Sequence, residues 1–303
     1  MNVLIIGLGS IAKKHIKVLR NILNDINIYA LRSSKESSQY EDIINIGALA
    51  DLNNIKIDFA IISNPTSLHI EKINDLLVLN CPIFIEKPLS NDLNIGKIKE
   101  KVIQSGVMTY VACNLRFLHS LKFIKEKLEK GEKRLNEVNI YCGSYLPDWR
   151  PGNFLDYYST NVELGGGVHF DLIHELDYTY WMFGEPIKAF KTLSKKSTLN
   201  INVYDYANYI LSYKDFNVSI ILNYYRRDSK RSFDLIFDDE TWEVDLLKNK
   251  ICSGNNILFQ SNQTITETYS DQMKYFISIL KNPYLSSNNS IEDSYKVLKM
   301  CLC

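Results

Sequence analysis

The sequence has no excess of charge of either sign and no long apolar run. Its 35 lysines and arginines balance 35 aspartates and glutamates, so the formal net charge is zero. A neutral chain lacks the basic footprint of a nucleic-acid-binding protein or of one drawn to an anionic membrane surface. No apolar stretch approaches the roughly 20 residues that a membrane-spanning helix needs. The apolar start "MNVLIIGLGS" has neither the positive flank nor the cleavage site of a signal peptide.

The six cysteines form no C-x-x-C pair of the kind that holds a metal ion. The nearest pair, Cys301 and Cys303, is weak support for any site. Buried, reduced thiols are the simpler interpretation, and they are typical of a cytoplasmic protein. These absences predict a globular protein with no nucleic acid, membrane or metal partner.

The first 118 residues alternate short apolar runs with helical patterns. Strands are predicted at 2–8, 26–32, 57–63, 82–88 and 108–114, with helices at 11–23, 67–79 and 91–105. This alternation predicts a parallel sheet covered on both faces. We therefore expect an α/β Rossmann domain over residues 1–118.

From about residue 135 the pattern changes to longer strands with period-two alternation, such as "VYDYANYILSY" and "FNVSIILNYY". Helical patterns interrupt or follow them at 121–131, 168–183 and 271–280. Long strands in succession, joined by short turns, are typical of an antiparallel sheet. The sequence predicts an α+β domain over residues 119–303, built on one large, mostly antiparallel open sheet.

The stretch "GLGSIA" places Gly7, Gly9 and Ala12 in the G-x-G-x-x-G/A pattern, between a strand and a helix. The first glycine permits a tight turn, and the second removes a side chain where the backbone must approach a pyrophosphate. The helix start then offers N–H groups and a positive dipole end to the phosphates. The pattern predicts a dinucleotide site whose loop residues are Gly7, Leu8, Gly9, Ser10 and Ile11.

The end of the second strand indicates which dinucleotide binds. An NAD site carries an acid there for the ribose 2′-hydroxyl, whereas this chain reads "ALRSSKE". Arg32 can pair with a 2′-phosphate, and Ser33 and Ser34 can donate to it. NADP(H) is favoured and NAD(H) stays possible, because Arg32 could instead cap a surface strand.

The stretch "FIEKPLS" places Glu86 and Lys87 just beyond a buried strand. The carboxyl ends of parallel strands are where such sheets bind ligands. Pro88 biases Lys87 away from α-helical geometry. The alternative is an exposed strand end with an incidental charge pair.

Five motifs then occur in order over the first 184 residues: "GLGSIA", "ISNPTSLH", "EKPLS", "NLRF" and "GGGVHFDLIHELDY". Together they resemble the Gfo/Idh/MocA family, the glucose-fructose oxidoreductase and inositol dehydrogenase group. The β-rich remainder resembles the family by pattern only. The resemblance implies NAD(P)-dependent redox chemistry on sugars, cyclitols or sugar nucleotides. It also implies a homodimer or homotetramer formed through the C-terminal sheet.

The resemblance also assigns roles to individual residues. Lys87 corresponds to the lysine that contacts both substrate and nicotinamide ribose, and His69 to a histidine that is more often structural. The other residues expected along the cofactor are Ser63, Asn64, Pro65, Glu86, Asn114 and Arg116.

A single helix over residues 168–183 would gather Asp171, His174, Glu175 and Tyr178 on one side. His174 suits proton transfer, and Lys87 suits the oxygen on which charge develops. Asp171 could orient the imidazole or bind a substrate hydroxyl. Alternatively, Asp171 only complements the helix dipole and His174 is a surface residue. Many relatives space the acid and histidine as D-x-x-x-H, whereas this chain has D-x-x-H.

The aromatic and polar stretch "SYLPDWRPGNFLDYYSTN" supplies substrate candidates. The Trp149 ring suits a sugar face and Arg150 suits a carboxylate or phosphate, although a loop packed for stability is an alternative. The stretch resembles the family branch of surface-polysaccharide and acidic-sugar pathways.

The predicted function is therefore hydride transfer between NADP(H) and an acidic or nucleotide-linked sugar. One alternative is an NAD-dependent dehydrogenase of myo-inositol or another free polyol. Another is a non-catalytic dinucleotide-binding sensor or assembly subunit, which would have no chemical need for both Lys87 and His174.

Overall fold

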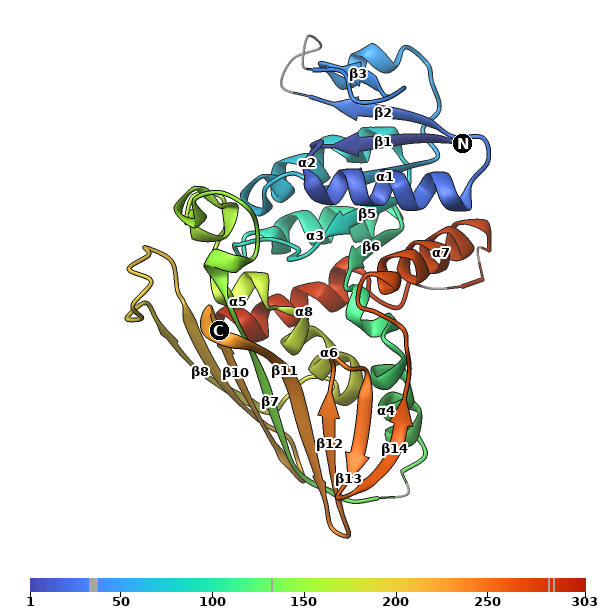
Figure 1. Ribbon diagram of the computed structural model, residues 1–303. Helices are drawn as coiled ribbons and strands as arrows, with labels where there is room; N and C mark the ends of the chain where they lie inside the picture. The colour runs from blue at the N-terminus through green and yellow to red at the C-terminus, as the bar shows by residue number, and fades with distance from the viewer. Residues whose placement is uncertain (33–37, 132, 283, 286) are drawn as a thin grey trace. The chain divides into compact units, whose positions relative to one another are not determined.

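The computed structural model describes residues 1–32, 38–131, 133–282, 284–285 and 287–303 (Figure 1). These residues form two compact units. The first unit is Met1–Cys113 with Tyr269–Leu298, and the second is Asn114–Thr268 with Lys299–Cys303. No helix in the described ranges is long and apolar enough to cross a membrane.

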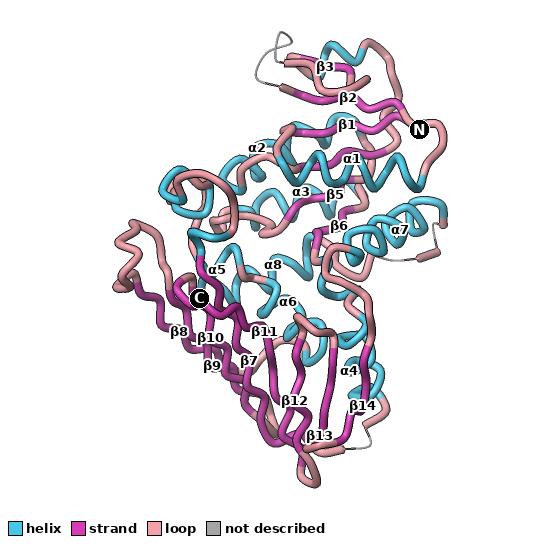
Figure 2. The backbone as a smooth tube through the Cα atoms, in the orientation of Figure 1, coloured by secondary structure: helices cyan, strands magenta, loops and turns pink. Residues whose placement is uncertain are grey.

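The first unit contains a six-stranded parallel sheet in the order β3-β2-β1-β4-β5-β6 (Figure 2). Its strands are β1 (Asn2–Ile6), β2 (Asn27–Leu31), β3 (Ile44–Ile46), β4 (Phe59–Ile62), β5 (Ile83–Glu86) and β6 (Thr109–Ala112). The central strands are buried along their whole length, as expected where helices cover both faces. The strand order is that of a Rossmann domain, which confirms the predicted fold class.

The helices of this unit follow the βα alternation and then return from the end of the chain. They are α1 (Ser10–Ile22), α2 (His69–Leu76) and α3 (Ile95–Ser105), with most of α7 (Glu267–Lys281) and of α8 (Ile291–Leu302). Short 3-10 helices lie at Leu49–Leu52, Thr66–Leu68 and Leu77–Leu79.

The returning segment Tyr269–Leu298 covers apolar side chains of the parallel sheet. The Phe276 ring of α7 lies edge-on to Phe59 and Phe84, with centroids 5.3 and 5.2 Å apart. Asn289 also exchanges hydrogen bonds of 2.9 and 2.8 Å with the backbone of Val111 in β6. The sequence-based division assigned all of residues 119–303 to a second domain. The compact units differ from it because the aromatic rings of β4 and β5 need this distant segment as cover.

The second unit contains an eight-stranded sheet in the order β14-β13-β12-β11-β7-β10-β9-β8 (Figure 1). Its strands are β7 (Leu135–Tyr145), β8 (Lys188–Ser194), β9 (Tyr206–Ser212), β10 (Asn217–Asn223), β11 (Tyr225–Phe237), β12 (Thr241–Asp245), β13 (Lys250–Ser253) and β14 (Asn256–Gln260). Strands β7 and β10 pair in parallel and the other neighbours pair antiparallel. The predicted mostly antiparallel sheet is confirmed.

Helices cover one face of this large sheet. They are α4 (His119–Glu129), α5 (Val168–Asp171) and α6 (His174–Phe183). The unit also contains short 3-10 helices at Asn114–Phe117, Leu146–Asp148, Phe154–Asp156 and Tyr158–Thr160. Side chains along strand β12 therefore alternate in exposure: Trp242 and Val244 are buried, while Thr241 and Glu243 are exposed. Such alternation marks a sheet with one packed and one open face.

The segment 168–183 is not the single helix that the sequence predicted. It breaks at Leu172 and Ile173, so α5 ends at Asp171 and α6 begins at His174. The side chain of Glu175 is fully buried and accepts from Arg231 at 2.8 Å. The single-helix prediction grouped Glu175 with Asp171 and His174, whereas its buried arginine partner makes this carboxylate part of the core.

Two histidines are buried in the cores of their units. His69 is 1% exposed, and burial lowers its pKa below the usual value. In the second unit, burial and the positive charge of Lys191 lower the pKa of His169 to about 4. Both histidines are therefore neutral in the folded protein near neutral pH.

We expect Arg231→Met to reduce the free energy of unfolding by about 3–5 kcal/mol, because Glu175 would stay buried without its cation. Denaturant unfolding monitored by circular dichroism measures the change. Lys248→Ala is the control, since Lys248 is 76% exposed and pairs only at the surface. Equal losses in the two variants would contradict a special role for the buried pair.

Stability should also decrease as the pH falls from 7 to 5. In this window the unfolded chain protonates a histidine near pKa 6.5, whereas His169 in the folded chain stays neutral until about pH 4. The unfolded state thus binds more protons, and His169 alone should remove about 2 kcal/mol. Urea unfolding of the wild type and His169→Asn across this range tests it. An identical pH dependence in both proteins would rule out His169 as the source.

Candidate active site

The loop after β1 turns at Gly7, whose φ is +83°. A Cβ atom on Gly7 would lie 2.9 Å from the Cα of Asn64, which is closer than real Cβ contacts come. The first glycine of the motif is therefore required twice, for its positive φ and for the approach of the chain after β4.

The helix that follows has a start suited to a phosphate. A Cβ atom on Gly9 would meet no atom within 4 Å, and Gly9 gives α1 no side-chain cap. The first N–H groups of a helix have no acceptor within it, so those of Ser10, Ile11 and Ala12 can donate to a ligand. Open space beside uncapped donors fits the pyrophosphate of a dinucleotide.

The loop after β4 is tied to the phosphate loop and to the turn after β5. The Ser63 hydroxyl lies 2.9 Å from the carbonyl oxygen of Gly7, to which it donates. The His69 imidazole lies between two carbonyl oxygens, with Nε2 3.1 Å from that of Asn64 and Nδ1 3.2 Å from that of Leu89. Ser63 and His69 thus hold the predicted cofactor loop in place through its backbone.

The end of β2 carries a cation where an NAD site would carry an acid. Arg32 is half-buried and its Nη1 lies 3.4 Å from Oδ1 of Asn45 in β3. Its backbone N–H donates to the carbonyl of Ile46 at 3.0 Å. Ser33 and Ser34, the other predicted 2′-phosphate ligands, lie outside the described residues.

Lys87 follows the last residue of β5, and its bond to Pro88 is cis. The preceding residue, Glu86, is buried, and its Oε1 lies 2.5 Å from Nε2 of His15 in α1. Sequence analysis did not select His15. Its spacing from the buried Ala12 and Leu19 was the available signal, because it places a polar ring on the buried side of the helix.

In the second unit, Asp171 is the centre of a small cluster. Tyr224 is buried and its hydroxyl donates to Oδ2 of Asp171 at 2.5 Å. Burial and the charge of Asp171 raise the pKa of Tyr224 well above its usual value, so its hydroxyl remains a donor. The Trp149 ring lies edge-on to Tyr224 at 5.3 Å, and its Nε1 donates to Ser144 at 2.9 Å. We call Trp149, Asp171 and Tyr224 the Asp171 cluster; sequence analysis missed Tyr224.

The remaining predicted residues of this unit are distributed differently. His174 begins α6 and is 7% exposed. Arg116 is buried and makes two hydrogen bonds to Asp177, at 2.8 and 2.7 Å. Asn114 donates to Thr268 at 2.7 Å, and Arg150 is exposed with its guanidinium 5.9 Å from the Tyr157 ring. Arg116 therefore uses much of its donor capacity inside the protein.

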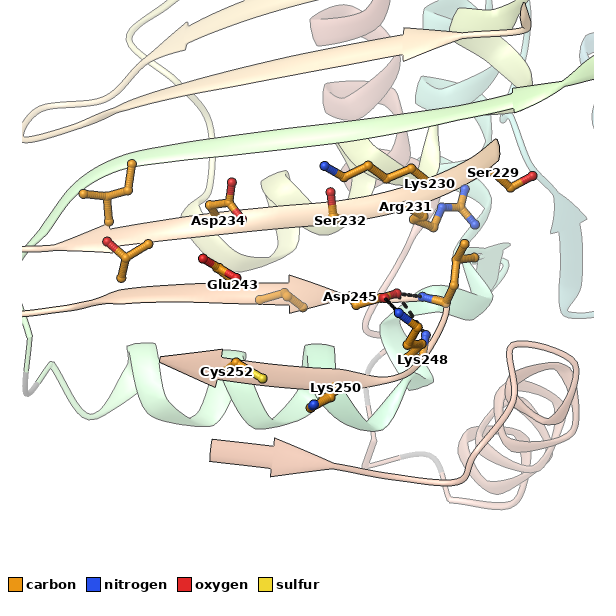
Figure 3. A pocket seen from close by; sticks show the side chains of 14 residues that line it. Ser229, Lys230, Arg231, Ser232, Asp234, Glu243, Asp245, Lys248, Lys250 and Cys252 are labelled. Carbon is orange, nitrogen blue, oxygen red and sulfur yellow. Dashed lines mark hydrogen bonds and ion pairs between the residues drawn. The ribbon is translucent and has the colours of Figure 1, made fainter. Parts of the chain in front are cut away.

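An open cavity of about 670 Å³ lies on the uncovered face of the large sheet, along β11, β12 and β13 (Figure 3). Charged side chains of both signs line it, including Lys230, Asp234, Glu243, Lys248 and Lys250. None of the predicted site residues does. Among the described residues, no cluster of His, Cys, Asp or Glu could hold a metal ion.

Comparison with known proteins agrees with this architecture. Residues 1–112 match the Gfo/Idh/MocA model, described as an oxidoreductase family with an NAD-binding Rossmann fold. Over 93% of its length the chain is 25% identical to myo-inositol 2-dehydrogenase of Thermotoga maritima, 89% of which is covered.

Solved structures match the whole fold. UDP-N-acetylglucosamine 3-dehydrogenase GnnA from Acidithiobacillus ferrooxidans superposes with a TM-score of 0.80 at 15% identity, over 100% of this chain and 95% of that one. The WlbA dehydrogenase of Bordetella pertussis, in complex with NADH and UDP-GlcNAcA, gives 0.80 at 16% identity, over 98% and 93%. The phosphate loop, the family match over residues 1–112 and these relatives together make the chain an oxidoreductase that carries the NAD-binding Rossmann domain of the Gfo/Idh/MocA family.

Proposed function

We propose that this protein transfers a hydride between NADP(H) and a carbinol or carbonyl carbon of a sugar. The observation that carries the proposal is the open space over Gly9 beside the uncapped start of α1, with Lys87 at the end of β5 in the same unit. When bound, the dinucleotide supplies or accepts the hydride. None of the six cysteines forms a disulfide, which supports a reducing, cytoplasmic setting.

The chain's own groups would handle the oxygen and its proton. As the alcohol is oxidised, negative charge develops on its oxygen, and the Lys87 ammonium would stabilise it. His174 would take the hydroxyl proton, and would return it in the reductive direction. Asp171, held by Tyr224, would accept a hydrogen bond from the imidazole or from a substrate hydroxyl.

NADP(H) is the cofactor we favour, because Arg32 follows β2 where an acid would bind the ribose 2′-hydroxyl. NAD(H) is the second candidate, since the WlbA dehydrogenase of similar fold was solved with NADH. Native mass spectrometry of freshly purified protein separates them, because a retained cofactor would reveal its phosphate count.

We favour an acidic or nucleotide-linked sugar as substrate. The Trp149 ring is held by its contacts with Tyr224 and Ser144. An aromatic ring held in this way suits the apolar face of a sugar. The exposed Arg150 can pair with a carboxylate or phosphate. The names of GnnA and of the WlbA complex support nucleotide sugars, whereas the Thermotoga maritima relative supports a free polyol such as myo-inositol.

We expect Lys87→Ala and His174→Asn each to lower turnover by about 10²–10⁴-fold, because each removes charge stabilisation or proton transfer. Steady-state kinetics over a panel of nucleotide sugars, uronic acids and polyols measures this, with melting temperature as a check of folding. Lys248→Ala is the matched surface-lysine control. Near-native turnover in Lys87→Ala would remove Lys87 from the mechanism. Tight dinucleotide binding without turnover on the whole panel would instead favour a sensor or assembly subunit.

We also propose a homodimer or homotetramer formed through the open face of the large sheet. Phe190 and Ile210 are cross-strand partners on β8 and β9, and they are 60% and 48% exposed. The cavity of Figure 3 adds charges of both signs on the same sheet. A face of this mixture can complement a second copy of itself.

Ile210→Lys should shift the protein toward the monomer, because it places a charge in the apolar part of the proposed interface. Ile103→Lys on α3 is the control, since Ile103 is also 48% exposed. Light scattering coupled to size-exclusion chromatography gives the mass. A monomeric wild type, or an Ile210→Lys variant with unchanged mass, would sink this assignment.

A further inference from the structure

His15 is a buried titratable residue that the proposed reaction does not use. It lies in the second turn of α1 and is 1% exposed. Its Nε2 is 2.5 Å from Oε1 of Glu86, although the two residues are 71 positions apart in the sequence. Glu86 ends β5 and precedes Lys87. The contact thus joins the helix of the phosphate loop to the strand end that carries the candidate lysine.

The orientation of the His15 ring is fixed by its surroundings. The ring lies edge-on to Phe84 with centroids 5.0 Å apart, and it is tilted against Tyr269 at 6.3 Å. Its Nδ1 is buried and has no hydrogen-bond partner among the described residues. Glu86 is therefore the hydrogen-bond partner of this ring, and an imidazole that carries a proton on Nε2 donates to it.

We propose that His15 is a positioning residue for dinucleotide binding that acts through Glu86, an inference that rests on the proposed function. With Oε1 held by His15, the carboxylate keeps Oε2 to accept a hydrogen bond from the nicotinamide half, through a ribose hydroxyl or the carboxamide. Helix α1 then serves both halves of the cofactor. Its first N–H groups bind the phosphates, and its His15 fixes the carboxylate that recognises the nicotinamide half.

If His15 had only a packing role, its loss would affect ligand binding differently. If the ring only fills space, its loss lowers the stability of the fold and weakens every dinucleotide fragment alike. If it positions Glu86, its loss weakens those ligands that carry the nicotinamide half. The compound 2′,5′-ADP separates the two, because it has the adenosine and the 2′-phosphate of NADPH but no nicotinamide.

The test is calorimetric binding of NADPH and of 2′,5′-ADP to full-length wild type, His15→Leu, His15→Gln and Glu86→Gln. We expect His15→Leu to weaken NADPH about tenfold, the usual scale for one hydrogen bond to a charged group. Binding of 2′,5′-ADP should stay within about twofold. His15→Gln should recover part of the loss, because its amide can donate to Glu86. Ile16→Val is the packing control on the same helix, and NADH with 5′-ADP replaces the pair if the wild type prefers NAD(H).

Several outcomes would overturn the inference. Equal weakening of both ligands by His15→Leu, or unchanged binding with a lower melting temperature, would leave a packing role alone for this residue. Multiplicative effects of His15→Leu and Glu86→Gln in the double variant would exclude the route through Glu86. A wild type that binds no dinucleotide would overturn the proposed function as well. A wild type that binds the dinucleotide but turns over no sugar would count against the proposed hydride transfer only. The comparison of NADPH with 2′,5′-ADP would still decide the role of His15.

Discussion

The close approach of Asn64 to Gly7 is the constraint on which the candidate cofactor site depends. The ends of β1 and β4 meet where a single Cβ atom would not fit. Ser63 then donates to the Gly7 carbonyl, and the His69 ring lies between the carbonyl of Asn64 and that of Leu89 in the turn after β5, with its single N–H donating to one of them. Three strand ends are thus held by contacts between side chains and backbone. A side chain at position 7 would displace the whole set, because each contact depends on the position of its neighbour.

In the second unit, buried ion pairs rather than a close backbone approach fix the candidate site. Helix α6 carries Glu175 and Asp177 into the core, and each meets an arginine from another element, Arg231 and Arg116. A buried carboxylate is tolerated only with such a partner, so the two pairs fix the rotation of α6 about its axis. The position of His174 at the start of this helix follows from that rotation.

The sequence predicted the regular parts of the fold and missed what depends on distant partners. The five predicted strands of the first domain agree with the structure to within about two residues, because buried parallel strands read as apolar runs between turn residues. Strand β3 is too short to give a pattern, and helix α8 was not predicted. Neither His15 nor Tyr224 belongs to a motif, and their importance comes from Glu86 and Asp171, far away in the sequence. The break between α5 and α6 likewise depends on tertiary packing, so the helical periodicity of the sequence does not predict it.

The parallel pairing of β7 with β10 has a consequence for how this enzyme could change its specificity. Two neighbouring parallel strands cannot be joined by a hairpin, so the chain must cross over between them. The first part of that crossover, residues 146–187, contains Trp149, Asp171 and His174, whereas its later part forms strands β8 and β9 of the sheet, and Tyr224 follows β10. The sheet therefore acts as a frame, and residues 146–187 act as an exchangeable cassette. Insertions and replacements within the cassette can reshape substrate recognition while the hydrogen-bonded register of the frame is left unchanged.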